Sequence, residues 1–117
     1  MSGTDESVFV RHMLDAVARV ERYVSGVERE AFLADEILQD AVVRQLEILG
    51  EAAGRISRPV CARHPEIPWP KVTGLRHRLI HYYFGVDFKL VWKVATAEIA
   101  ELKPKLQALL RDIDQGS

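Results

Sequence analysis

The sequence has one cysteine, Cys61, and no apolar run near the length of about 20 residues that crosses a bilayer. A lone cysteine can form no internal disulfide, which is typical of proteins from a reducing compartment. The first residues also lack the charged and then apolar pattern of a secretion signal. We therefore expect a cytoplasmic protein that has no membrane association.

The chain also lacks internal repeats, low-complexity tracts and any linker long enough to divide it. Its 117 residues are the usual size of one domain, and 48% hydrophobic residues are enough for one core. We predict a single domain over residues 1–117. The polar ends are expected to fray, which leaves an ordered part of about residues 5–113.

A strong excess of charge of one sign is absent, because the formal net charge is −1. The charges are nevertheless unevenly distributed. Residues 1–54 carry 5 arginines against 11 acidic residues, whereas residues 55–93 carry 8 basic residues against 2 acidic ones. The basic middle segment could attract phosphate, or the acidic and basic helices could simply pair with each other. Charge alone leaves both interpretations open.

Apolar residues recur at helical spacing through most of the chain. One stripe covers residues 9–27, and a second covers residues 37–56 with Asp35 as its expected N-cap. Gly50 and Gly54 share a face of the second predicted helix. Their spacing is equally consistent with a close contact between helices and with tolerance near a helix end.

The second half of the chain is predicted as shorter helices. Residues 57–70 contain four prolines, which indicate a helical turn followed by a structured loop. Helix then resumes near Lys71 and is expected to stop around Gly85. Asp87 is predicted to cap a last helix, which Pro104 should kink or restart. No stretch alternates as a strand does, so we predict an all-α compact bundle of four to five helices.

Residues 74–87 are the most informative segment, because two histidines, two arginines and two tyrosines gather in it. On a helix with 100° per residue, the predicted core face consists of Val72, Leu75, Leu79 and Tyr82. The second face holds Arg76, Ile80 and Tyr83, with His77 and His81 further around. Such a mixed face is expected to meet a neighbouring helix, a second copy of the chain or a phosphate.

Arg76 and His81 have the chemistry that RNA cleavage without a metal requires. A neutral imidazole, with a pKa near 6.5, can take the proton from a ribose 2′-hydroxyl. A guanidinium can hold the scissile phosphate and stabilise the charge that develops on it. The substrate supplies its own nucleophile. The bare spacing of the two residues is common, and a hydrogen-bonded contact across a dimer interface is the other interpretation.

Three blocks of the sequence resemble those of HepT-like proteins, within the HEPN superfamily. The segment Arg76-x4-His81-x-Tyr83 matches the R-x4-H-x-Y signature of that family. Residues 46–53 are similar to its second long helix and residues 63–69 to its characteristic loop. The resemblance extends over residues 5–112, in the order and spacing of the family.

This resemblance implies an HEPN-like helical fold and a toxin of a type VII toxin–antitoxin pair. HepT-like proteins form homodimers in which two R-x4-H motifs meet in a composite cleft, and active members cut RNA, such as tRNA or mRNA, without metal or another cofactor. Their partner is a nucleotidyltransferase antitoxin of the MntA type, which transfers AMP to the motif tyrosine. By residue match, Arg76 and His81 are catalytic and Tyr83 is the modification site.

His77 and Arg78 are predicted as supporting residues. The position after the motif arginine is usually polar, most often asparagine, so His77 could be a second base, a phosphate contact or an orienting group. Arg78 points away from the Arg76 face and could contact RNA, a partner or solvent. The alternative function is a non-catalytic dimeric adaptor, in which Arg76 and His81 would be buried in a closed interface instead of exposed in a basic cleft.

Other conspicuous residues are predicted to have structural or surface roles. The residues concerned are His12 on the surface, His64 in a structural or capping role, Trp69 and Trp92 in packing, and Glu47 and Glu51 on the surface or in pairs between helices.

Overall fold

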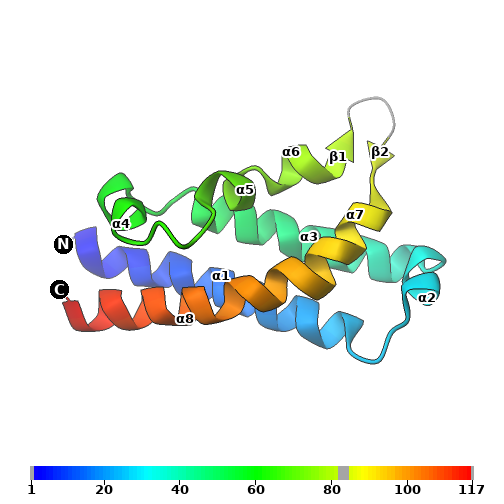
Figure 1. Ribbon diagram of the computed structural model, residues 1–117, viewed down its shortest axis with the longest axis horizontal. Helices are drawn as coiled ribbons and strands as arrows, with labels where there is room; N and C mark the ends of the chain where they lie inside the picture. Colours follow the sequence, from blue (N-terminus) through cyan, green and yellow to red (C-terminus); the bar gives the residue numbers. More distant parts are fainter. Residues whose placement is uncertain (1, 82–84, 117) are drawn as a thin grey trace.

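The computed structural model describes residues 2–81 and 85–116. Three long helices form the body of the molecule: α1 (Ser2–Val24), α3 (Glu36–Ala53) and α8 (Ile99–Gly116). Helix α1 packs against both α3 and α8, and the two chain ends lie together at one end of the bundle (Figure 1). The predicted all-α class is confirmed. Helix α1 begins at Ser2 and α8 ends at Gly116, and the ordered range of about 5–113 stays a prediction.

Shorter helices complete the bundle. Helices α5 and α6 follow each other along α3, whereas α7 and the π-helical segment η1 lead without a break into α8 (Figure 1). The bounds of these elements are α2 (Arg29–Leu33), α4 (Arg58–Arg63), α5 (Trp69–Thr73), α6 (Leu75–Leu79), α7 (Phe88–Lys93) and η1 (Val94–Glu98). Among the described helices, none is long and apolar enough to cross a membrane.

The helix starts follow the predicted capping. The side chain of Asp35 accepts a hydrogen bond of 3.0 Å from the backbone N–H of Leu38. Asp87 accepts one of 3.1 Å from the N–H of Leu90, at the start of α7. Each cap satisfies a donor that the first turn of a helix leaves without a partner. Both predicted caps are confirmed.

The predicted helix from Lys71 to Gly85 is wrong in its second half. Helix α6 ends at Leu79, and the chain continues as strand β1 (Ile80–His81), which pairs antiparallel with β2 (Gly85–Val86). The β-branched and aromatic residues after position 79 favour extended backbone. Gly85, the first residue of β2, has φ = +78°, a conformation that suits glycine. Arg76 and Ile80 therefore belong to a helix and a strand instead of one helix face, and Tyr83, the third residue of that predicted face, lies outside the described residues.

Pro104 lies inside α8, and the helix runs through it without restarting. The irregular part of this continuous helix is the π-helical segment η1, which ends six residues before Pro104. There the hydroxyl of Thr96 donates a hydrogen bond of 2.7 Å to the carbonyl of Trp92. A threonine that bonds back to residue i−4 loosens the helical ladder, which is consistent with a π turn at this place.

The core lies where α1, α3 and the α7–α8 helix meet. Its largest fully buried side chains include Met13, Phe32, Leu46, Leu49, Leu79, Ile99, Leu106 and Leu109. Val72, Leu75 and Leu79 are buried as predicted, which places one side of α5 and α6 against the core. Tyr82, the fourth residue of that predicted face, lies outside the described residues.

Gly50 allows α5 to approach α3 closely. A Cβ atom at this position would lie 3.0 Å from the carbonyl oxygen of Val72 and 3.7 Å from that of Thr73. At Gly54 an added Cβ would meet only backbone oxygens of α3 itself, at 3.5 Å or more. Of the two interpretations of this pair, close contact therefore holds at Gly50 and tolerance near the helix end holds at Gly54.

We predict opposite effects of alanine at these two glycines. Gly50→Ala should lower the free energy of unfolding by about 1–2 kcal/mol, because the backbone of α5 must move and this outweighs the gain in helix propensity. Gly54→Ala should be neutral or stabilising by about 0.5 kcal/mol. Urea unfolding of both variants measures the difference. Equal stability of the two variants would contradict the close approach of α5.

His64 ties the loop after α4 to the C-terminal part of α8. Its Nε2 lies 2.7 Å from a carboxylate oxygen of Asp112, and its Nδ1 lies 3.0 Å from one of Glu66. The side chain is only 12% exposed. Burial lowers the pKa of His64, but the hydrogen bonds to Asp112 and Glu66 outweigh it, so the pKa is raised overall. The predicted structural role of His64 is confirmed.

The raised pKa of His64 predicts a pH dependence of stability. The protonated ring stabilises the fold below the unfolded pKa of about 6.5, and this stabilisation is lost as the pH rises through the folded pKa. His64→Gln should therefore lower the melting temperature by a few degrees at about pH 6 and by clearly less at about pH 9. Thermal melts across this range test it, with the exposed His12→Gln as control. A deficit that does not change with pH would show that the charge of His64 contributes nothing.

Candidate active site

Arg76 is the second residue of α6, and its side chain is 79% exposed. It lies beside an open depression, whose lining residues are Thr73, Gly74, Arg76, His77 and Ile80. His77 is exposed as well. The helix thus buries Leu75 and Leu79 against the core and presents its arginine and first histidine to solvent.

Glu47 on α3 is the acidic neighbour of Arg76. One of its carboxylate oxygens lies 3.6 Å from Nε of Arg76, and the other lies 4.0 Å from a terminal nitrogen of Arg44. The predicted pairing of Glu47 between helices is confirmed. The contact is made at the Nε edge of Arg76, the edge nearest the stem of the side chain.

His81, the second motif residue, is the last residue of β1, and its backbone pairs with that of Gly85. The motif is therefore divided between a helix and a strand. The backbone N–H of Asp87 donates a hydrogen bond of 2.8 Å to the carbonyl of Leu79, which closes the hairpin at its base. The side chain of His81 and the whole of Tyr83, the predicted modification site, lie outside what the structure describes.

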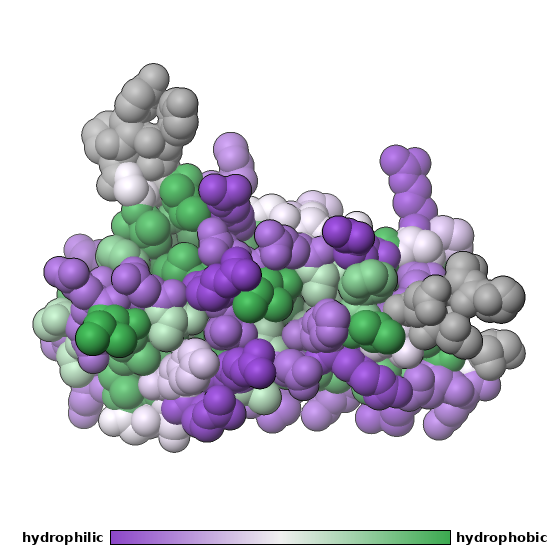
Figure 2. Space-filling view, turned by 180° about the vertical axis from the view of Figure 1, so that it is seen from behind, coloured by the Kyte–Doolittle hydropathy of each residue, from purple (hydrophilic) through white to green (hydrophobic). Residues whose placement is uncertain are grey.

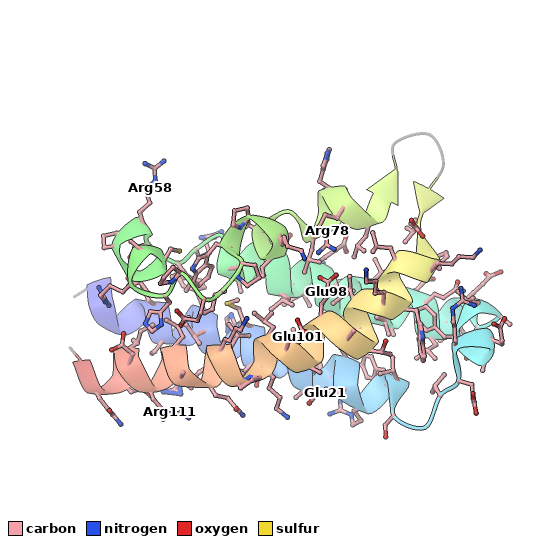
Figure 3. All side chains as sticks on the ribbon, viewed as in Figure 1. Glu21, Arg58, Arg78, Glu98, Glu101 and Arg111 are labelled. Atoms are coloured by element: carbon pink, nitrogen blue, oxygen red, sulfur yellow. The ribbon has the colours of Figure 1, made fainter. Side chains whose placement is uncertain are left out.

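Arg78 has a partner that we did not foresee. Its two terminal nitrogens donate hydrogen bonds of 3.0 Å to both carboxylate oxygens of Glu98, at the end of η1. The two side chains point toward each other across the gap between α6 and the C-terminal helix (Figure 3). The predicted contacts with RNA, a partner or solvent therefore compete with an internal ion pair, and a supporting role of Arg78 at the site stays a prediction.

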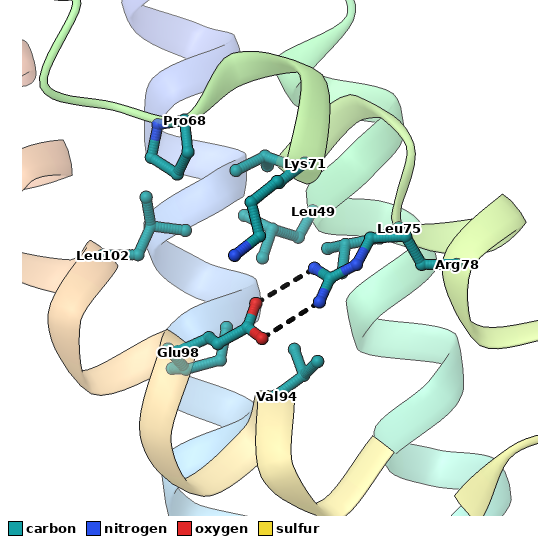
Figure 4. Close-up of a pocket in the computed structure, with 10 residues that line it drawn as sticks. Leu49, Pro68, Lys71, Leu75, Arg78, Val94, Glu98 and Leu102 are labelled. Carbon is teal, nitrogen blue, oxygen red and sulfur yellow. Dashed lines mark hydrogen bonds and ion pairs between the residues drawn. The ribbon is translucent and has the colours of Figure 1, made fainter. Parts of the chain in front are cut away.

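The Arg78–Glu98 pair closes one side of a small, mainly apolar hollow, into which Lys71 also points (Figure 4). Each side chain of the pair is 25% exposed. The hydrogen bond from Arg78, helped by the positive charges of Lys71 and Lys93, holds the pKa of Glu98 below its usual range. Glu98 therefore stays ionised at neutral pH, and the pair joins α6 firmly to the long helix.

The basic middle segment pairs in part with acidic residues of the fold, which was one of the two interpretations of its charge. Arg63 and Arg78 form ion pairs with acidic residues of the C-terminal segment, Asp112 and Glu98. Arg58 instead points away from the body of the molecule into solvent (Figure 3). Part of the positive charge thus stabilises the fold, and Arg58 and Arg76 remain on the surface.

Other predicted roles are also confirmed. His12 is exposed, and the rings of Trp92 and Phe32 pack with their centroids 5.2 Å apart. Trp69 is partly buried, and its indole N–H donates a hydrogen bond of 3.1 Å to the carbonyl of His64.

Among the side chains that the structure describes, no three of His, Cys, Asp or Glu gather as metal ligands would.

Two partners of the site were hard to identify from the sequence. Glu98 lies 20 positions from Arg78, and its role depends on how η1 packs against α6. Glu47 was conspicuous only as one of two glutamates a turn apart. Its neighbour Leu46 is fully buried, and this periodicity puts Glu47 at the side of α3, where a packed helix can reach it.

Comparison with known proteins identifies the family. The model of the family described as Ribonuclease HepT-like matches residues 13–109. A "Probable ribonuclease HepT" of Thermococcus cleftensis is 39% identical over 101 residues, which cover 86% of this chain and 92% of the relative. A "Putative RNase MJ1216" of Methanocaldococcus jannaschii is 34% identical over 114 residues, 97% of this chain and 94% of the relative. No solved structure matches the chain. The chain therefore belongs to the HepT-like ribonuclease family.

Proposed function

We propose that this protein is an endoribonuclease that cuts RNA without a metal, with Arg76 and His81 as its catalytic residues. The observation that carries the proposal is the 79% exposure of Arg76 beside an open depression, in a chain of this family. A guanidinium in that position can bind a phosphate from solvent. An adaptor that hides its motif in a closed interface would need the arginine covered by its partner.

The proposed chemistry is a transesterification within the RNA. His81 takes the proton of a ribose 2′-hydroxyl, and the 2′-oxygen attacks the adjacent phosphorus. The bond from phosphorus to the 5′-oxygen breaks, which leaves a cyclic phosphate on one fragment. The departing 5′-oxygen takes a proton from solvent or from a second acid, for which the exposed His77 is the candidate. Arg76 stabilises the charge on the phosphate oxygens.

We further propose that the active form is a homodimer in which two motifs share one cleft. The chain leaves apolar surface for such an interface: Ile37, at the start of α3, is 84% exposed. Seen from behind, hydrophobic side chains gather at the end of the molecule where β1 and β2 lie (Figure 2). Ile80 and Val86, which pair across these strands, are only partly buried. A second copy would cover this surface and bring a second arginine near the depression.

The remaining part of the proposal is regulation by a partner. The protein would be the toxin of a toxin–antitoxin pair, silenced when a nucleotidyltransferase of the MntA type transfers AMP to Tyr83. Tyr83 follows His81 by two positions, so the added phosphate and purine would lie close to the histidine in the chain. A negative charge there would repel the RNA backbone.

Cleavage should survive removal of metal and require both motif residues. With tRNA or total RNA in excess EDTA, the unmodified protein should cut, and Arg76→Ala or His81→Ala should each lower kcat/KM by about 100-fold or more. The exposed Arg58→Ala serves as the charge control and should keep most of the activity. Analytical ultracentrifugation should give twice the chain mass of 13.3 kDa. Equal cutting by all variants would indicate a contaminating nuclease, and no cutting by the unmodified dimer would refute the proposal.

Modification of Tyr83 should slow cleavage strongly. Incubation with an MntA-type nucleotidyltransferase, ATP and Mg²⁺ should add AMP to Tyr83 and lower the cleavage rate at least about tenfold, because the added phosphate repels the substrate. Tyr83→Phe should escape the modification, whereas Tyr23→Phe, on α1, should not. Intact mass and peptide mapping locate the AMP. Modified protein that cuts RNA at the full rate would contradict this mechanism of silencing.

A further inference from the structure

The carboxylate of Glu47 lies beneath two exposed arginines. It is 24% exposed, whereas the side chains of Arg44 and Arg76 are 63% and 79% exposed. Each of its oxygens faces a different guanidinium, at 4.0 Å for Arg44 and 3.6 Å for Arg76. Glu47 is thus the shielded member of a group whose two cations face solvent.

Glu47 is well placed to orient its neighbours, because α3 holds it firmly. The adjacent Leu46 is fully buried, and α3 packs against both α1 and α6. Among the described side chains, Glu47 is the acidic group that contacts this largely exposed arginine. The contact at Nε occupies the inner edge of the guanidinium. The two terminal nitrogens form the outer fork, which is the part that binds a phosphate through two parallel hydrogen bonds.

We propose that Glu47 is a positioning residue for Arg76, which holds the guanidinium by its Nε edge and directs the terminal nitrogens toward the scissile phosphate. The proposal rests on the proposed ribonuclease function. It assigns to α3 a part of the site that lies outside the R-x4-H motif. The carboxylate contacts Arg76 and need not touch the RNA.

The same carboxylate must also disfavour the binding of RNA, because its charge repels a phosphate on Arg76. A positioning role and a repulsive role change the kinetic constants differently. Loss of orientation lowers kcat, since the transition state depends on the direction of the guanidinium. Loss of the negative charge lowers KM. A purely structural ion pair on the surface would change neither constant and would contribute little to folding.

Glu47→Gln tests this prediction, because it removes the charge and keeps the shape. We expect kcat to fall about tenfold and KM to fall about two- to threefold, with an unchanged melting temperature. The matched control is Glu51→Gln, the same change one turn further along α3 at an exposed position, which should leave both constants within twofold. Unchanged kcat and KM in Glu47→Gln would overturn the proposal while the ribonuclease function stands.

A second measurement needs no RNA. Relaxation of the ¹⁵Nε signal should show Arg76 more ordered than Arg58, which points freely into solvent (Figure 3). In Glu47→Gln the order of Arg76 should fall to that of Arg58, and in Glu51→Gln it should not. Equal mobility of Arg76 in wild type and Glu47→Gln would overturn the positioning role. Ordered Arg76 in a wild-type protein that cuts no RNA would instead refute the proposed function and with it the catalytic purpose of the contact.

Discussion

The packing of α5 and α6 against α3 is the interaction on which the candidate site depends. Helices α5 and α6 have five residues each, and helices so short are not stable alone in water. They persist because Val72, Leu75 and Leu79 are buried and because Gly50 lets the carbonyl of Val72 come close. On the other side, the double hydrogen bond from Arg78 to Glu98 ties α6 to the C-terminal helix. Arg76 is thereby presented on a short but rigid support.

The two arginines of α6 have different surroundings. Side chains two positions apart on a helix are rotated by about 200°, so they point to nearly opposite sides. Arg78 forms an ion pair with the ionised Glu98, whereas Arg76 is largely exposed and contacts Glu47 through its Nε edge. A uniformly basic surface would attract nucleic acid without orienting it. In the proposed function, the internal pairing of Arg78 leaves Arg76 as the arginine of α6 that is available to a phosphate.

The sequence predicted the helical class, the capping residues and the burial of Val72, Leu75 and Leu79, because these follow from periodicity and local chemistry. Asp35 and Asp87 act within three residues of themselves, and such short-range effects are readable from the chain alone. The end of α6 was misplaced, because the apolar residues after Leu79 continue a helical period although their branched and aromatic side chains favour extended backbone. The periodicity therefore predicted a helix at the position of α6 but placed its C-terminal end too late in the chain. The partner of Arg78 was missed for a different reason: it is set by tertiary packing over 20 residues.

Figure 1 shows that the chain begins and ends at the same end of the bundle, whereas the hairpin of β1 and β2 rises near the other end. The termini are therefore far from the candidate site. An affinity tag or a fluorescent protein fused to either terminus would be held away from Arg76 and the hairpin. The proximity of the ends also makes the molecule suitable for circular permutation, in which a short linker joins the old termini and new ones are opened elsewhere. Two copies could likewise be joined by a linker in one chain, with Arg76 substituted in one copy and His81 in the other.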